Sequence, residues 1–130
     1  LFPDRSATQI ELAQTDCRNI GIKAPVRSSG DTKGTPGVTL RGPNGTLTVP
    51  EGVMIADRHI HMTPAQAAAF GLADGDRVQV KIGGPKPGVM GGVLIRANDK
   101  CALDFHIDTD DGNAFLLKQG QLVTVLGKEE

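Results

Sequence analysis

The chain has 130 residues, enough for one domain or two very small ones. Its 17 glycines and 8 prolines favour short strands and turns over a helical bundle, and the lack of Trp and Tyr predicts an aliphatic core. A net charge of −1 argues against a general nucleic-acid or anionic-membrane binder, and no apolar run nears the roughly 20 residues of a membrane helix.

Short elements are expected along the first part of the chain. In chain order they are a strand at 8–12, a helical turn at 15–19, a polar loop at 24–37, a hairpin at 38–49 and a strand at 52–56. Thr15 or Asp16 is expected to cap the helical turn. The hairpin follows from Asn44-Gly45, the strongest short-range signal for a tight turn between two strands.

The second part opens with the best helix signal in the chain. Thr63 is a predicted N-cap, Pro64 fits the first helical position, Gln66 completes a capping box and Gly71 ends the helix. The elements expected after it are strands at 77–82, 92–97 and 102–106, a short helix within 110–118, and a last strand at 121–126. A weak internal repeat of helix, glycine turn and alternating strand fits a small β-barrel capped by short helices.

Two of the three histidines form the triplet His59-Ile60-His61. Residues i and i+2 of a strand project from the same face, so these two imidazoles can converge on one metal ion. His106 ends another predicted strand, and if the strands are neighbours the three histidines could form an open zinc site. Surface histidines, or hydrogen-bonded histidines in the core, are the alternative interpretation of the same pattern.

An acidic cluster follows His106. Asp108, Asp110 and Asp111 lie close together, but the late Glu of a calcium loop is absent, since that position is Gln119. We expect Asp108 or Thr109 to cap the following helix, which is the more common role for such residues. An Asp near a metal-bound His could also orient the imidazole.

The remaining residues with charged or reactive side chains lie in no recognisable local motif. Arg5 and Glu11 are indistinguishable by spacing from ordinary surface charges. Cys17 and Cys101 lack the spacing of a metal or redox motif and are expected to be free thiols in a reducing compartment. They match no catalytic motif.

A resemblance covers essentially the whole chain. The stretch IADRHIHMTPAQAAAFGLADGDRVQV resembles the C-terminal half of the PduL-type phosphate acyltransferases (phosphotransacylases, or phosphate propanoyltransferases) of bacterial microcompartments. The segments GIKAPVRSSGDTKGTPGVTLRGPNG and FHIDTDDGNA match in order and spacing, and LFPDRSATQIELAQTD resembles the start of the same region. Together these motifs are more specific than any one of them.

The resemblance implies a mostly β fold of two barrels capped by short helices. Family members begin with a further segment that carries an H-V-H motif and supplies strands to one barrel. We therefore expect this chain to be a C-terminal portion made of two partial barrel segments, 1–56 and 57–130. It is expected to be inactive alone and to need the missing N-terminal half or a companion chain.

The resemblance also implies the chemistry. Acyl-CoA, such as propanoyl-CoA, and phosphate would interconvert with acyl phosphate and coenzyme A at a site with two metals, expected to be zinc. The implied site residues are His59, His61 and His106 on one metal, Glu11 with the missing H-V-H on the other, Arg5 on phosphate, and Asn113 lining the site. Phosphate would be the nucleophile, so no nucleophilic side chain is required.

Two alternatives differ in class. One is a non-catalytic small β-barrel with a structural or adventitious metal, which is disfavoured because structural zinc sites usually have four protein ligands, often Cys. The other is a nucleic-acid-binding barrel, disfavoured by the few aromatic residues. The expected partners are acyl-CoA, phosphate and further copies of the chain, without nucleic acid or membrane. The resemblance implies a cytoplasmic location in the lumen of a microcompartment, and a role such as propanediol degradation.

Overall fold

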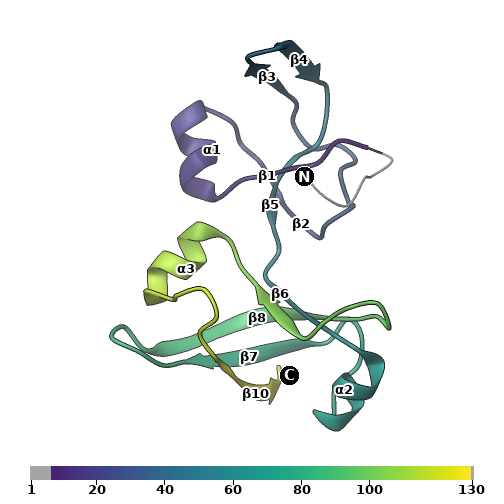
Figure 1. Cartoon of the computed structure of the whole chain (residues 1–130), viewed down its shortest axis with the longest axis vertical. Helices are drawn as coiled ribbons and strands as arrows, with labels where there is room; N and C mark the ends of the chain where they lie inside the picture. Colours follow the sequence, from purple (N-terminus) through teal and green to yellow (C-terminus); the bar gives the residue numbers. More distant parts are fainter. Residues whose placement is uncertain (1–6, 130) are drawn as a thin grey trace. The chain divides into compact units, whose positions relative to one another are not determined.

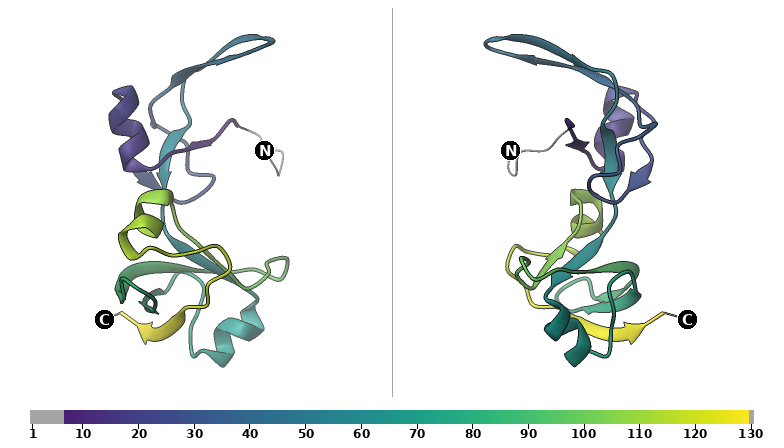
Figure 2. Two further views of the ribbon diagram at one scale, coloured as in Figure 1. Left: turned by 60° about the vertical axis from the view of Figure 1, so that its left-hand side comes forward. Right: turned by 90° about the vertical axis from the view of Figure 1, so that its right-hand side faces the viewer.

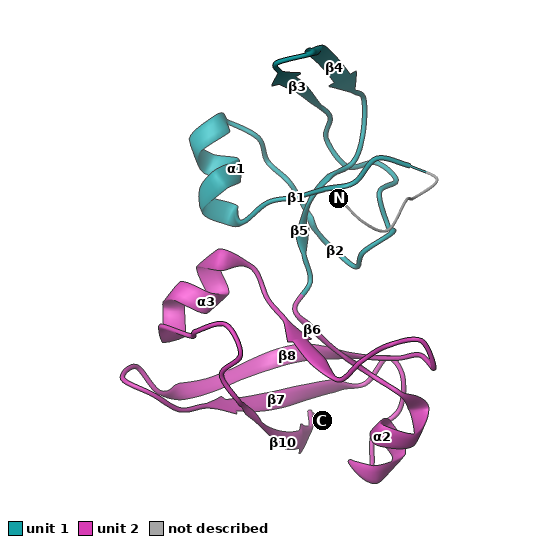
Figure 3. Cartoon of the chain, in the orientation of Figure 1, with its two compact units in different colours: residues 1–57 teal, residues 58–130 magenta. Residues whose placement is uncertain are grey.

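A computed structural model describes residues 7–129, which form ten strands and three helices of at most seven residues each (Figures 1 and 2). The mostly β class predicted from the sequence is confirmed. The chain divides into two compact units, residues 1–57 and 58–130 (Figure 3). Within the described range, no helix combines the length and apolar character needed to cross a membrane.

Unit 1 is built around one apolar strand. Its elements are β1 (Ile10–Glu11), α1 (Gln14–Ile20), β2 (Val26–Arg27), β3 (Val38–Gly42), β4 (Gly45–Val49) and β5 (Val53–Ala56). Both β1 and β2 pair with β5 in parallel, giving the order β1-β5-β2. Three consecutive side chains of β5, from Val53 to Ile55, are buried, as expected for a central strand covered on both faces.

The hairpin prediction for unit 1 is confirmed. Strands β3 and β4 pair antiparallel from Val38↔Val49 to Gly42↔Gly45, so that Pro43 and Asn44 form the turn. Figure 2 shows the two strands as one continuous ribbon that doubles back on itself. The positive φ of Gly45 (136°) explains the need for glycine there.

Two local predictions for unit 1 are wrong. Helix α1 begins after Ala13 without a side-chain cap, so neither Thr15 nor Asp16 is the N-cap. The segment 24–37 contains the strand β2 rather than being loop throughout. Because β2 is only two residues long and is stabilised by pairing with β5, far away in sequence, local pattern could not reveal it.

Unit 2 contains a five-stranded sheet of order β10-β7-β8-β6-β9. Its elements are β6 (His59–Met62), α2 (Pro64–Ala69), β7 (Arg77–Ile82), β8 (Gly88–Ala97), β9 (Asp104–His106), α3 (Thr109–Phe115) and β10 (Thr124–Lys128). Strands β6 and β8 are parallel, and the other three pairs are antiparallel. Strand β8 begins four residues earlier than predicted, and β10 lies two to three residues later.

The core of unit 2 is aliphatic, as the composition predicts. Strand β7 alternates strictly, with Val78, Val80 and Ile82 fully buried and the residues between them exposed. Ile60, Met62, Val93 and Ile95 complete the centre of this cluster from β6 and β8. Each such side chain contributes roughly 1.5–3 kcal/mol to the stability of the fold on full burial. The five-stranded sheet is therefore well stabilised by its core.

Both helix caps predicted for unit 2 are confirmed. Thr63 Oγ1 accepts the Gln66 backbone N–H at 3.2 Å, and the Gln66 side chain accepts the Thr63 N–H at 2.9 Å. This reciprocal pair is a complete capping box. At α3, Asp108 Oδ1 accepts the Asp111 N–H at 2.8 Å, so Asp108 is the N-cap.

The predicted closed barrels are not found. Among residues 7–129 the strands form three open sheets, of three, five and two strands. In the five-stranded sheet β9 and β10 are the two edges, and neither pairs on its outer side with another described strand. Closure needs a pairing partner for these edges that the described residues do not supply.

An ion pair ties the last strand to the turn before β7 and makes stability depend on pH. Lys128 Nζ lies 2.6 Å from Asp76 Oδ1, and Asp76 Oδ2 accepts the Ala73 N–H. The hydrogen bond from Lys128 is the main reason that the pKa of Asp76 lies below its ordinary value of 3.8. Because folding lowers this pKa, its stabilising effect is complete above the ordinary value and is lost as the pH falls through the folded value.

We therefore expect Asp76→Asn to lower the melting temperature at pH 7. The melting temperature of this variant should also drop less than that of the wild type when the pH falls below about 4. Thermal melts followed by circular dichroism between pH 2.5 and 7 measure both effects. Asp99→Asn, at an exposed turn, is the matched control. Parallel curves for the wild type and Asp76→Asn would contradict this role of the pair.

Candidate metal centre

Strand register brings the three histidines to one face of unit 2. His59 and His61 alternate with the buried Ile60 along β6 and therefore project from the opposite face. Strand β9 runs antiparallel beside β6, with His106 directly opposite His59 and Asp104 opposite His61. Directly opposed residues share a face, so His106 joins the other two.

The three imidazoles converge closely. One nitrogen from each ring lies within 4.8 Å of those of the other two. The ring centroids are 4.7 Å apart for His59 and His61, 5.0 Å for His59 and His106, and 4.9 Å for His61 and His106. The Nε2 atoms of His59 and His61 are 3.1 Å apart.

The environment favours the neutral form of the His61 imidazole, which is the form that binds metals. His59 is buried at 8% exposure, His61 is half-buried and His106 is exposed. Burial lowers the pKa of His61, and the nearby His59, His106 and Arg96 lower it further, against an opposing effect of Asp104. A proton on His61 is disfavoured by its neighbours, whereas a shared metal cation would be attracted to a lone pair on each of the three rings.

The spacing fits a first-row metal ion. Three nitrogens bound to tetrahedral zinc at about 2.0–2.1 Å would lie roughly 3.3–3.4 Å apart. The 3.1 Å separation of the His59 and His61 nitrogens is already close to this value. Three protein ligands leave a fourth position for water or substrate, as in catalytic rather than structural zinc sites.

Two further side chains contact the histidines, and sequence reasoning missed both. Cys101 Sγ lies 3.3 Å from His61 Nδ1. Asp104 Oδ2 lies 3.1 Å from His106 Nε2. The signal for Asp104 was its position two residues before His106, which places both side chains on one face of a strand.

The other predicted site residues are Arg5, Glu11 and Asn113. Arg5 falls outside the described residues. Glu11 lies on β1 in unit 1, paired in register with Met54, and its carboxylate accepts a hydrogen bond from the Gln9 amide. Asn113 lies on α3 in unit 2 and lines a pocket.

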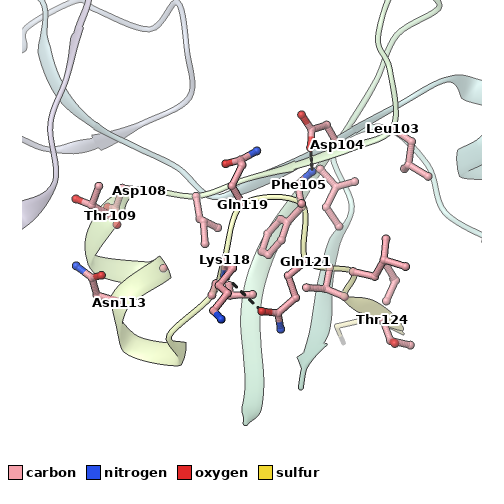
Figure 4. A pocket seen from close by; sticks show the side chains of 18 of the residues that line it. Leu103, Asp104, Phe105, Asp108, Thr109, Asn113, Lys118, Gln119, Gln121 and Thr124 are labelled. Carbon is pink, nitrogen blue, oxygen red and sulfur yellow. Dashed lines mark hydrogen bonds between the residues drawn. The ribbon is translucent and has the colours of Figure 1, made fainter. Parts of the chain in front are cut away.

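That pocket has a volume of about 720 Å³ and extends between the two edges of the five-stranded sheet. Residues 103–105, 107–109 and 117–125 line it, together with Asn113 of α3 (Figure 4). Ile60 and Phe105, which alternate with the histidines along β6 and β9, also line it. The pocket therefore lies mainly on the sheet face opposite the imidazoles, with Asp104 as a lining residue shared with the histidine face.

Two of the three acids after His106 have structural contacts. Asp108 caps α3, and Asp111 Oδ1 lies 3.1 Å from Arg58 Nη2. This ion pair ties the first turn of α3 to the residue just before β6. Both roles fix α3 against the sheet and make no use of calcium-loop geometry.

Comparison with known proteins identifies related sequences across most of the chain. A family model described as phosphate propanoyltransferase matches residues 1–118. The phosphate propanoyltransferase of Thermotoga maritima is 46% identical over 127 residues, covering 97% of this chain and 60% of that protein. Those of Rhodopseudomonas palustris and Salmonella typhimurium are 44% and 46% identical, over 98% and 88% of this chain.

The matches cover only part of each relative. The shares are 60% of the Thermotoga protein, 57% of the Rhodopseudomonas protein and 55% of the Salmonella protein. The chain thus spans between half and three fifths of the length of these curated relatives.

Proposed function

We propose that this chain, which belongs to the phosphate propanoyltransferase family, forms part of a metal-dependent phosphate acyltransferase site. The reaction interconverts a short acyl-CoA, such as propanoyl-CoA, and phosphate with acyl phosphate and coenzyme A. The observation that carries this proposal is the convergence of His59, His61 and His106 on one face of β6 and β9.

These three histidines would hold one zinc ion. The supporting facts are the close nitrogen spacing and the lowered pKa of His61. When bound, zinc supplies Lewis-acid polarisation of a carbonyl or phosphoryl oxygen and a favourable partner for a thiolate sulfur. Strand β6 holds His59 and His61 on the packed sheet, so these two ligands are positioned before the metal binds, and β9 brings His106 beside them when it pairs with β6.

The remaining roles concern the phosphate and the thioester. Arg5 would hold phosphate through charge-assisted, forked hydrogen bonds, and Asn113 would line the substrate site. A phosphate oxygen forms the new bond to the acyl carbon while the carbon–sulfur bond breaks, and coenzyme A leaves with both electrons of that bond. No enzyme nucleophile is needed, which agrees with the complete burial of Cys17.

A further segment would complete the enzyme. Glu11 would serve a second zinc together with an H-V-H motif in the part of the relatives that this chain does not match. The same part would add a strand between β9 and β10 and close the sheet as a barrel. Support comes from the open edges, from the pocket between them and from Leu103 and Leu122, which are 52% and 93% exposed beside it.

We place the assembled enzyme in the cytoplasm, in the lumen of a bacterial microcompartment, as a homo-oligomer. This assignment follows from the family alone. Zinc stoichiometry of the chain, together with phosphate-dependent release of coenzyme A from propanoyl-CoA by the completed enzyme, tests the proposed function. Absence of bound zinc in a folded chain would exclude it, and zinc binding without thiol release by the completed enzyme would favour the non-catalytic alternative.

The role of Arg5 predicts a selective defect. Arg5→Ala in the completed enzyme should raise KM for phosphate by about 10- to 150-fold, which corresponds to roughly 1.5–3 kcal/mol for a hydrogen bond to a charged group. KM for propanoyl-CoA should change little. Arg5→Lys should restore only part of the phosphate affinity, because an ammonium lacks the planar fork. Equal losses for both substrates would contradict a phosphate-specific role.

A further inference from the structure

Cys101 and Asp104 each contact one ring of the histidine cluster. Cys101 precedes β9, and its sulfur lies 3.3 Å from His61 Nδ1. Asp104 lies on β9, and one carboxylate oxygen is 3.1 Å from His106 Nε2. The two contacts thus reach different nitrogens of the two rings.

This difference decides which nitrogen each ring can offer. A neutral imidazole has one N–H and one lone pair, and a metal binds the nitrogen that has the lone pair. Metal-bound histidines usually donate the other N–H to a carboxylate or another acceptor, which fixes tautomer and ring orientation. An acceptor at Nδ1 therefore selects Nε2 as the ligand, and an acceptor at Nε2 selects Nδ1.

For His61 the ligand atom would be Nε2. Its Nδ1 faces the sulfur of Cys101, whereas its Nε2 lies 3.1 Å from Nε2 of His59, inside the cluster. When Nε2 binds the metal, the proton of the neutral ring is on Nδ1, and Nδ1–H donates to the sulfur. The sulfur is a weak acceptor, so this contact orients the ring more than it polarises it.

For His106 the assignment is reversed. Asp104 is acceptor-only when ionised, so Nε2 of His106 must be the donor in their contact. The lone pair then lies on Nδ1. The contact is solvent-exposed, with 46% and 64% exposure of the two side chains, but a charged acceptor makes it stronger than the contact at His61.

We infer that Cys101 and Asp104 are positioning residues that hold His61 and His106 in opposite tautomers, so that one metal is bound through Nε2 of His61 and Nδ1 of His106. The inference rests on the metal site proposed above. It concerns the selection of ligand atoms and gives neither residue contact with substrate.

The test uses the whole chain labelled with ¹⁵N. Two-bond ¹H–¹⁵N spectra of the imidazoles, recorded with and without zinc, identify the protonated and the metal-bound nitrogen of each ring. We expect Nδ1–H with metal-bound Nε2 for His61, and Nε2–H with metal-bound Nδ1 for His106. The same bound nitrogen in both rings would overturn the inference.

Variants supply a second readout that does not depend on activity. Zinc affinity, measured by competition with a chelator, should fall about 10- to 100-fold in Asp104→Ala, as is typical when an outer partner of a ligand is removed. Asp104→Asn retains an oxygen acceptor and should lose less zinc affinity than Asp104→Ala. Cys101→Ala should bind zinc more weakly than Cys101→Ser, because the serine side chain keeps an acceptor atom. Asp99→Ala, an exposed acid before the same segment, should match the wild type.

The outcomes separate this inference from the metal site itself. Failure of the wild-type chain to bind zinc would overturn both. Zinc binding that requires His59 but is unchanged within twofold in Asp104→Ala and Cys101→Ala would overturn the positioning role alone. Melting curves of the metal-free variants identify general folding defects; if Asp104→Ala is unfolded, Asp104→Asn and the tautomer assignments still decide the question.

Discussion

Replacing His59 by alanine should reduce the zinc affinity of the chain by more than about 100-fold. Loss of an outer partner alone typically costs 10- to 100-fold, and His59 would be a direct ligand. His59 is also the most buried of the three rings, at 8% exposure, and its Nε2 already lies 3.1 Å from that of His61. Its removal leaves two imidazoles, too few for a site with one open position. Elemental analysis and chelator competition measure the loss.

The control must separate ligand loss from misfolding. Gln79→Ala changes an exposed side chain on β7 of the same sheet and should leave zinc stoichiometry at one per chain. His61→Ala and His106→Ala should match His59→Ala, since the three rings form one cluster. Unchanged zinc stoichiometry in a folded His59→Ala chain would show that the metal binds elsewhere, and the proposed function would lose its main support.

The 130 residues assayed alone should show no phosphate-dependent release of coenzyme A from propanoyl-CoA. Their three histidines suffice for one metal, whereas the proposed mechanism needs a second metal bound by Glu11 and a further segment. The open edges β9 and β10 should also promote association of the isolated chain. Thiol release with and without phosphate, and size-exclusion chromatography, measure the two effects.

A chimera provides the complementary experiment. The part of the Thermotoga maritima relative that this chain does not match, about two fifths of that protein, would be fused to the chain. The chimera should bind two zinc ions and turn over propanoyl-CoA. A control chimera with both histidines of the added H-V-H motif replaced by alanine should bind one zinc and be inactive. Turnover by the 130 residues alone, equal to that of the full-length relative, would defeat the two-metal interpretation.

Elements with strong local signals were predictable from the sequence. The Asn44-Gly45 turn located the hairpin, the pair Thr63 and Gln66 located the start of α2, and strict alternation located β7. The missed strand β2 is only two residues long and depends on distant pairing with β5. Strand β8 was predicted too short because glycines at 88, 91 and 92 weaken the local strand signal.

The candidate site shows the same division between local and distant information. The triplet His59-Ile60-His61 establishes by itself that two imidazoles share a strand face. That His106 lies opposite His59 depends on the β6–β9 register, which the sequence could only suggest through a strand-end histidine. The contacts of Cys101 and Asp104 depend on the path of the chain into β9, which no local pattern specifies.

The position of His106 on an edge strand links metal release to local unfolding. Strand β9 has three residues and, among the described strands, pairs with β6 alone, so in the metal-free chain it should open readily. An ion held by His59, His61 and His106 would bridge β6 and β9, and opening of β9 would break the site. When free zinc is about 1,000-fold above the dissociation constant, the open state becomes about 1,000-fold less populated. The free energy of opening then rises by about 4.1 kcal/mol. Amide hydrogen exchange in β9 would then report zinc occupancy directly, and the lifetime of the bound ion would be limited by the opening rate of a three-residue strand.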